Sequence, residues 1–190
     1  MSILGVSLFG PPDPAEVVGK HGPQVYRHLR RIFGPNTDID DVYQNVFMEV
    51  LRSLPSFRGR SRLSTWIRRI TWNVAYQEMR LTYRHKHLTE LDEAAVAGRE
   101  EPVDALAERN VAMGRLYAAL EQIEPRLRAP VIMHDVEGRT LKEISRELGR
   151  PLPTVASQLY SGRERLARMM NRKAQAGRAG QRSPGREGRS

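Results

Sequence analysis

Residues 140–170, TLKEISRELGRPLPTVASQLYSGRERLARMM, carry the most distinctive pattern in the chain. Thr140 and Glu143 have the spacing of a capping box, in which each side chain satisfies a free backbone amide at the start of a helix. Gly149 is expected to end that helix, and the turn RPLP leads to a longer helix expected from Thr154 to about Met170. The pattern predicts a helix-turn-helix, a common means of placing a helix in the DNA major groove.

The residues just before this motif complete a small helical module. One helix face is predicted from apolar residues at helical spacing, namely Met113, Leu116, Tyr117, Leu120 and Ile123. Pro125 opens a further short helix that Gly138 ends. Pro130 falls inside that short helix, so we expect the helix to start late or to bend there.

A second helical module is predicted upstream of residue 89. From Asp38 a single apolar stripe follows helical spacing until Pro55, which makes this the most secure helix of the chain. The stripe consists of Val42, Tyr43, Val46, Phe47, Val50, Leu51 and Leu54. Before it, Gly22 and Pro23 are expected to separate a short helix, begun by Asp13 and Pro14, from a second one that ends near Phe33.

A basic loop, residues 56–62, leads to a third long helix of this module. Ser64 or Thr65 is expected to cap that helix. Its inner face is predicted to contain Trp66, Ile67, Ile70, Val74 and Ala75. No long β-branched run with period-two alternation occurs, so we expect an all-α chain made of two small helical domains.

Charge is distributed unevenly along the 190 residues. The net charge is +6 over residues 1–89, −6 over residues 90–108, +4 over residues 109–170 and +5 over residues 171–190. The acidic segment, with Gly98 and Pro102, has the character of a flexible linker. The overall charge of +9 favours polyanionic partners, nucleic acid first and an anionic membrane surface second.

Several function classes lack support in the sequence. The chain has no cysteine, which excludes disulfides and Cys-ligated zinc, and its five histidines give no ligand set. No cofactor, metal or enzyme motif is expected. The N-terminus, residues 1–13, is expected to be loose and has neither a signal-peptide pattern nor a membrane span, so we expect a cytoplasmic protein without membrane insertion. Residues 171–190 are expected to be a disordered basic tail.

Two segments together resemble the extracytoplasmic-function (ECF) sigma factors of bacterial transcription. The similarity to domain two of that family covers residues 40–49, DDVYQNVFME, then Phe57, the stretch LSTWIRRI at 63–70, Asn73 and Arg80. The stretch from Leu116 to Met170 is similar to domain four. The resemblance implies domain two at residues 14–88, a linker at 89–108 and domain four at 109–170.

The resemblance also implies a surface for core RNA polymerase. In the family the helix that bears the acidic residue, the glutamine and the aromatic residue docks on the polymerase. The implied polymerase-binding residues are Asp41, Gln44, Asn45 and Glu49, whose spacing places them on one side of the helix. From the residues alone, a solvated polar face opposite the core is the simpler interpretation.

Promoter DNA is the other partner that the resemblance implies, with an anti-sigma protein as a third. In the first module the candidate contacts to melted DNA are Arg58, Arg60, Arg62, Arg68, Arg69, Trp72, Tyr76 and Arg80. Trp66 is expected to lie in the core, whereas Trp72 and Tyr76 lie off the apolar stripe and are expected to be exposed. In the second module the candidates are Thr154, Ser157 and Gln158 for bases, with Arg163 and Arg165 for phosphates.

The chain departs from the family pattern in its last predicted helix. The family usually has a basic residue at the positions of Ala156 and Gln158 and a glycine at that of Pro153, so the base sequence that is read stays open. A protein of a different class, a helix-turn-helix regulator that binds DNA as a dimer without polymerase, is the alternative. A palindromic footprint by the protein alone would distinguish it from a sigma factor.

Overall fold

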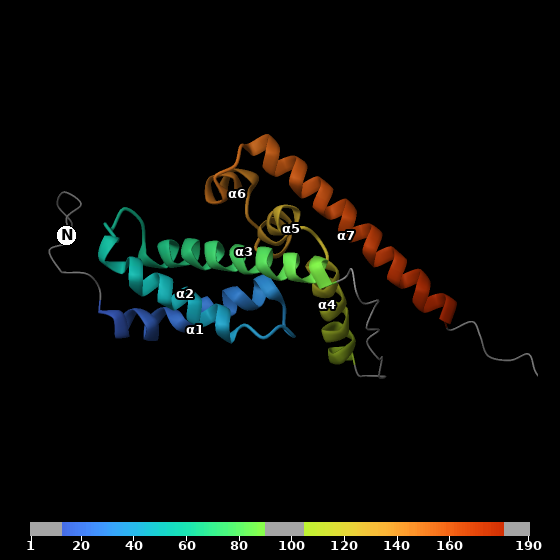
Figure 1. Cartoon of the computed structure of the whole chain (residues 1–190), viewed down its shortest axis with the longest axis horizontal. Coiled ribbons are helices and arrows are strands. Elements are labelled where there is room, and N and C mark those ends of the chain that lie inside the picture. The colour runs from blue at the N-terminus through green and yellow to red at the C-terminus, as the bar shows by residue number, and fades with distance from the viewer. Residues whose placement is uncertain (1–12, 90–104, 181–190) are drawn as a thin grey trace, which may run out of the picture.

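The computed structural model describes residues 13–89 and 105–180, with side chains for residues 13–88 and 110–172. In these ranges all regular elements are helices, as the sequence predicts. Figure 1 shows two layers, in which α1 and α2 lie on one side of α3 and the helices α5, α6 and α7 lie on the other. No described helix is both long enough and apolar enough to cross a lipid bilayer.

The first module consists of α1 (Pro14–Phe33), α2 (Asp40–Ser53) and α3 (Leu63–Thr89), with a short 3-10 turn at Leu54–Ser56. The predicted stripe of α2 is confirmed at its centre, because Val42, Val46, Phe47 and Val50 are all buried. Helix α1 differs from the prediction, since it continues through Gly22 and Pro23. Val17 and Val25 are buried on either side of this proline, so burial of one continuous apolar face overrides the helix-breaking residues.

Helix α3 begins one residue before the expected caps. The Arg62 carbonyl accepts the backbone amide of Trp66 at 3.1 Å, so neither Ser64 nor Thr65 has the capping position. Burial around α3 also extends further than predicted, to Thr71, Trp72 and Met79. The reason is that α3 contacts α1 and α2 on one side and α5 on another.

The second module consists of α4 (Ala105–Glu121), α5 (Pro125–Val131), a π-helical turn (Ile132–Val136), α6 (Leu141–Leu148) and α7 (Leu152–Gly180). The capping box at Thr140 is confirmed, and Gly149 ends α6 with a left-handed φ of 62°. Helix α7 begins two residues before Thr154 and continues to Gly180, ten residues into the segment that the sequence analysis expects to be a disordered tail. The rest of the predicted tail and most of the predicted linker, residues 90–104, lie outside the described residues.

Pro130 lies within α5, which neither starts late nor stops there. A proline cannot donate the helical hydrogen bond to the carbonyl four residues earlier, here that of Arg126. That carbonyl instead accepts a hydrogen bond from Arg150 Nη1 at 3.3 Å. The chain passes into the π-helical turn just after this proline.

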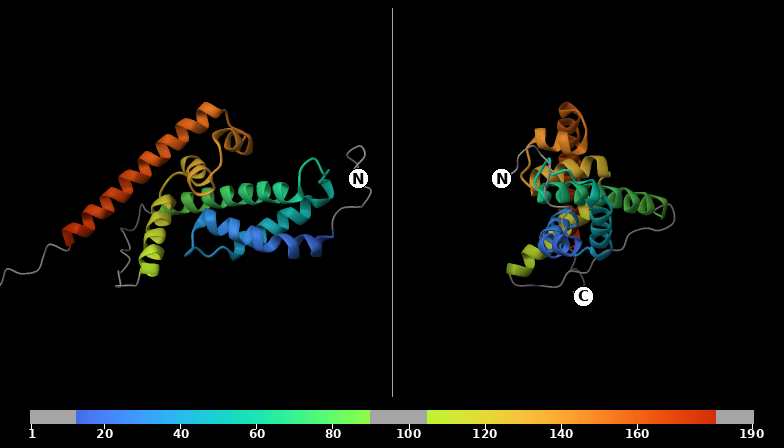
Figure 2. Two further views of the ribbon diagram at one scale, coloured as in Figure 1. Left: turned by 180° about the vertical axis from the view of Figure 1, so that it is seen from behind. Right: turned by 90° about the vertical axis from the view of Figure 1, so that its left-hand side faces the viewer.

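The two modules pack against each other through α3 and α5, and through α1 and the π-helical turn. The left view of Figure 2 shows α5 lying along α3. Tyr117 of α4 donates its hydroxyl proton to the Arg31 carbonyl at 2.6 Å. Its ring lies against Gly34, where an added Cβ would come within 2.5 Å of the ring. The cores of both modules therefore join into one cluster of buried side chains.

Candidate polymerase and nucleic-acid surfaces

The polar face predicted on α2 is on the outside of the molecule. Asp41, Gln44 and Asn45 are exposed, and Glu49 is half-buried and pairs with Arg52 at 2.8 Å. The helix thus brings the four predicted polymerase-binding residues to one face, opposite the buried stripe.

Met48 is an addition to this face that the sequence analysis missed. With about 100° between successive residues of a helix, Met48 lies between Gln44 and Asn45 on the circumference. Its side chain is 68% exposed, the largest exposure among the apolar residues of α2. A single exposed apolar residue is common on protein surfaces, so Met48 is added only because it lies at the centre of the predicted polar face. Its absence from the predicted stripe was the available signal in the sequence.

The basic loop before α3 is open to solvent. Arg58, Arg60 and Arg62 are exposed, and Gly59 has a left-handed φ of 66° that allows the loop to turn. Beside the loop, the rings of Phe57 and Trp66 lie 5.1 Å apart. Trp66 is half-buried and packs against the core, which agrees with its predicted place.

Three of the predicted DNA contacts form one row along α3, because Arg68, Trp72 and Tyr76 follow each other at intervals of four residues. The expected exposure of Trp72 is wrong: its side chain is only 1% exposed. Tyr76 is half-buried, whereas Arg68 stays exposed, as do Arg69 and Arg80 elsewhere on the helix. The second module lies over this row, a contact between distant segments that the spacing within α3 cannot reveal.

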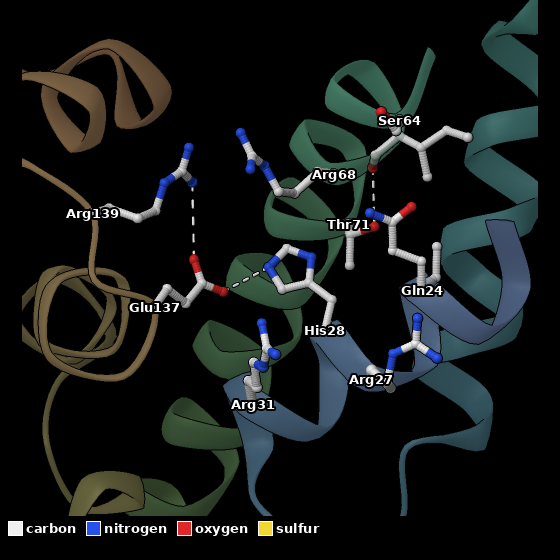
Figure 3. Close-up of a pocket in the computed structure, with 11 residues that line it drawn as sticks. Gln24, Arg27, His28, Arg31, Ser64, Arg68, Thr71, Glu137 and Arg139 are labelled. Carbon is white, nitrogen blue, oxygen red and sulfur yellow. Dashed lines mark hydrogen bonds and ion pairs between the residues drawn. The ribbon is translucent and has the colours of Figure 1, made fainter. Parts of the chain in front are cut away.

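Glu137 covers Trp72. The indole Nε1 of Trp72 donates to one carboxylate oxygen of Glu137 at 3.1 Å, and His28 Nε2 lies 2.7 Å from the other. Arg139 is a third neighbour, with its Nη1 3.9 Å from the same carboxylate. Figure 3 shows His28, Glu137 and Arg139 of this group, with Arg31 of α1 and Arg68 of α3 on either side of the His28–Glu137 pair.

Helix α7 carries the predicted base-reading residues near its start. Thr154 and Ser157 are exposed, and Gln158 is half-buried because its amide oxygen accepts a hydrogen bond from Arg150 Nη1 at 3.0 Å. The other terminal nitrogen of Arg150 donates to the Tyr76 hydroxyl at 2.7 Å. One guanidinium therefore connects two predicted DNA-binding residues from different modules.

The two predicted phosphate contacts of α7 differ in their surroundings. Arg165 is exposed and lies on the same side of the helix as Thr154 and Gln158. Arg163 lies on the opposite flank of the buried face, where its Nε donates to Asp135 at 2.9 Å. Hydrogen bonds from Arg163, and more weakly from His134, lower the pKa of Asp135 against an opposing effect of desolvation. The charge of Arg163 is thus compensated within the protein.

Tyr160 is a second residue that the sequence analysis missed. It lies on α7 between Ser157 and Arg163, and 72% of its side chain is exposed. Because Tyr160 is exposed beside Ser157 on the circumference of the helix, and its ring and hydroxyl offer apolar and polar contacts, it is added to the candidate DNA-contacting surface. The signal in the sequence was its position off the stripe of Val155 and Leu159, both of which are buried.

Comparisons with known proteins find matches for both modules. Residues 17–85 match the family described as Sigma-70 region 2, and residues 113–166 match Sigma-70, region 4. The chain is 31% identical to ECF RNA polymerase sigma factor SigE of Mycolicibacterium smegmatis over 156 residues, which are 82% of this chain and 60% of SigE. It is 30% identical to ECF RNA polymerase sigma factor SigM of Mycobacterium tuberculosis over 151 residues, which are 80% of this chain and 74% of SigM.

Solved structures show the same fold. The sigma factor RpoE from Bartonella quintana, in complex with the anti-sigma factor NepR, superposes with a TM-score of 0.54 at 18% identity, over 83% of this chain and 96% of RpoE. CnrH, in complex with the cytosolic domain of CnrY, gives 0.52 at 20% identity, over 83% of this chain and 87% of CnrH. With region 2 followed by region 4 in one all-helical chain, the protein belongs to the ECF group of RNA polymerase sigma factors.

Proposed function

We propose that this chain binds core RNA polymerase, directs it to promoters and helps to melt the DNA there. The observation that carries the proposal is the presence of region 2 and region 4 in one chain, each with its own exposed candidate surface. Proteins of this family are regulatory, and no catalytic residue is assigned. The chain would act in the cytoplasm, where polymerase and promoters are found.

The outer face of α2 is the proposed polymerase anchor. Its three exposed polar residues, Asp41, Gln44 and Asn45, surround Met48. An apolar centre with a polar rim is the common composition of a specific protein interface. Glu49 is placed at the edge of this surface, because Arg52 already compensates part of its charge.

The loop and α3 are proposed to receive the melted downstream element. Exposed arginines supply charge for phosphates, and aromatic side chains supply surfaces on which unstacked bases lie. The proposed residues are Arg58, Arg60, Arg62, Arg68, Arg69, Trp72, Tyr76 and Arg80. For Trp72 and Tyr76, this role requires that the second module move away from α3, because it covers them here.

The start of α7 is proposed to read the upstream element in the major groove. Thr154 and Ser157 are exposed for base contacts, and Arg165 for phosphate contact. Gln158 would exchange its hydrogen bond from Arg150 for a base edge, and an adenine contact of this kind contributes about 1 to 3 kcal/mol of discrimination. Arg163 is a weaker phosphate candidate because of its pairing with Asp135.

We also propose that a protein antagonist regulates this chain. RpoE and CnrH, which share its fold, were each solved with a protein bound, the anti-sigma factor NepR and the cytosolic domain of CnrY. An antagonist that holds the two modules together would keep Trp72 and Tyr76 covered.

The experiment that tests the proposed function is DNA footprinting on a genomic promoter pool, with and without core polymerase. We expect protection of two unlike elements, dependent on the polymerase. A palindromic footprint produced by the protein alone would instead support the self-sufficient regulator considered from the sequence.

A further inference from the structure

A cavity of about 300 Å³ lies between α1, α3 and the segment that follows α5. Arg27 and Arg31 of α1 and Arg68 of α3 contribute to its wall (Figure 3). None of these three arginines forms an ion pair with any residue that the structure describes. The first module therefore presents three guanidinium groups without an ion pair to this cavity.

Glu137 is the only carboxylate among the residues that line the cavity, and it comes from the second module. Its side chain is only 8% exposed. Both oxygens contact groups of the first module, His28 at 2.7 Å and the Trp72 indole N–H at 3.1 Å. An imidazole, an indole N–H and nearby guanidinium groups form a set of donors that suits a phosphodiester oxygen as well as a carboxylate.

The same contact covers aromatic surface that suits a nucleic-acid base. Trp72 is buried beneath Glu137, and the His28 ring lies edge-on to it with 6.0 Å between the ring centres. One turn further along α3, Tyr76 lies beneath Arg150, whose guanidinium carbon is 5.3 Å from the ring centre. Unstacked nucleic-acid bases stack on aromatic side chains of this kind.

The contact between the modules also carries unfavourable contributions. Arg128 of α5 is 5% exposed and lies over the Phe33 ring of α1, yet its Nε and Nη2 have no hydrogen-bond partner. Burial accordingly lowers the pKa of Arg128. Arg139 Nη1 is also buried without a hydrogen-bond partner. A buried donor without a partner is unfavourable, and more so if it is charged, which suits an interface that separates.

We infer that His28, Arg31 and Trp72, flanked by Arg27 and Arg68, form a binding site for single-stranded promoter DNA, and that Glu137 occupies the place of a phosphate when the modules are together. A phosphate would take the position between His28 and the indole N–H, and an adjacent base would stack on Trp72. The inference rests on the proposed function and adds α1 to the DNA path.

The test uses the full chain with Trp66→Phe, which leaves Trp72 as the only tryptophan and its emission as the reporter. A single-stranded oligonucleotide is titrated into this parent and into Glu137→Gln, which keeps the shape of the side chain and removes its charge. We expect Glu137→Gln to bind at least about fivefold more tightly, with quenching of Trp72, because a competing group inside the protein is weakened.

Matched variants separate this effect from general charge. Glu16→Gln makes the same change of charge at an exposed position of α1 outside the cavity, and should leave affinity close to that of the parent. Adding Arg31→Ala to Glu137→Gln should remove most of the gain, whereas adding Arg146→Ala on α6 should not. Circular dichroism of each variant confirms folding, and Glu137→Ala gives a second measurement if Glu137→Gln is unstable.

Three results would overturn the inference. The first is an equal gain in oligonucleotide affinity from Glu137→Gln and Glu16→Gln. The second is a gain in affinity that persists when Arg31→Ala is added to Glu137→Gln. The third is quenching of Trp72 by pyrophosphate at the same concentrations as the oligonucleotide, which would indicate a site for small anions. Because the assay contains no polymerase, it can be interpreted even if the proposed sigma activity fails. Conversely, a chain that directs initiation but shows no gain from Glu137→Gln rejects this site alone.

Discussion

Arg150, in the turn between α6 and α7, donates hydrogen bonds to groups from three other helices. Its acceptors are the Arg126 carbonyl, the Gln158 amide oxygen and the Tyr76 hydroxyl. The first of these has no helical donor because Pro130 occupies the position four residues later. The sequence motif identifies the turn, but the acceptors at Arg126 and Tyr76 lie 24 and 74 residues away, so local spacing could not predict these contacts.

At the same scale, Arg163 and Arg165 should respond differently to mutation. A phosphate contact adds about 0.9 to the slope of log affinity against log salt concentration. Arg165→Ala should therefore flatten the slope by about 0.9, since Arg165 is exposed and has no ion pair within the described residues. Arg163→Ala should flatten it clearly less, because Asp135 already compensates that charge. The measurement is titration of promoter DNA with holoenzyme at several salt concentrations, and equal slopes for the two variants would contradict this assignment.

Asp135 gives a prediction for the dependence of stability on pH. Its pKa in the folded protein is lowered, chiefly by the hydrogen bond from Arg163. Its contribution to stability is thus present above the unfolded value of about 3.9 and is lost as the pH falls through the folded pKa. Asp135→Asn should cost less than about 1 kcal/mol at pH 7, because the pair is partly exposed. Urea unfolding of the wild-type chain and of Asp135→Asn should show that the difference in their free energies of unfolding is smaller near pH 3 than at pH 7. A difference that is larger near pH 3 would contradict a stabilising Asp135 carboxylate.

At the scale of elements, the packing of α7 on α5 depends on Gly162. A Cβ added there would lie 2.6 Å from Val131 Cγ2 and 2.7 Å from the Leu127 carbonyl oxygen. Gly162→Ala should therefore lower the free energy of unfolding by about 1 to 3 kcal/mol. The matched control is Gly19→Ala in α1, where nothing lies within 4 Å of the added atom. That change should raise stability by up to about 1 kcal/mol, because alanine is the better helix former. Urea unfolding measures both, and effects of the same sign would show that close helix contact is not the cause.

The exposed face of α2 has its own prediction. Met48→Ala and Gln44→Ala should each weaken binding to core polymerase by about 1 kcal/mol or more, as expected near the centre of an interface. Leu81→Ala is the control, since Leu81 is also an exposed apolar residue, 45% accessible, but lies on α3. Binding is measured by fluorescence anisotropy with labelled chain. If Leu81→Ala weakens binding as much as Met48→Ala, the α2 face is not the anchor.

Elements that depend on local interactions could be predicted from the sequence. The centre of the α2 stripe, the capping box at Thr140 and the glycine that ends α6 were predicted correctly, because their causes lie within a few residues. Leu51, predicted as part of the stripe, is instead exposed at its edge. Errors occurred where distant packing decides. Helix α1 continues through Pro23 because both of its halves bury residues in one core, and α7 starts at Leu152, two residues before the expected cap.

At the scale of the whole molecule, the contact between the modules changes what each surface can do. The sequence predicted two domains with separate surfaces, and it placed Trp72 off the core stripe of its own helix. The structure contradicts the exposure expected from that placement, because Trp72 is buried and Glu137 of the second module contacts its indole N–H. Local spacing contains no signal for this contact, because the two residues are 65 positions apart and belong to different modules.

Opening of this contact is the step that links the structure to the proposed function. Trp72 and Tyr76 of α3 and Gln158 of α7 are engaged in contacts within or between the modules. The proposed polymerase-binding face of α2 contains none of these residues, so binding there would leave them in place and would have to be followed by separation of the modules. The unsatisfied buried donors of Arg128 lower the cost of that separation.

In vitro run-off transcription on a genomic promoter pool tests the central claim most directly. The account predicts discrete transcripts when the chain and core polymerase are combined, and none with either alone. Transcripts should be strongly reduced with Asp41→Ala and Gln44→Ala together, while Leu81→Ala behaves as wild type. A folded chain that yields no transcripts above those of core polymerase, while binding a palindromic DNA site by itself, would contradict the account.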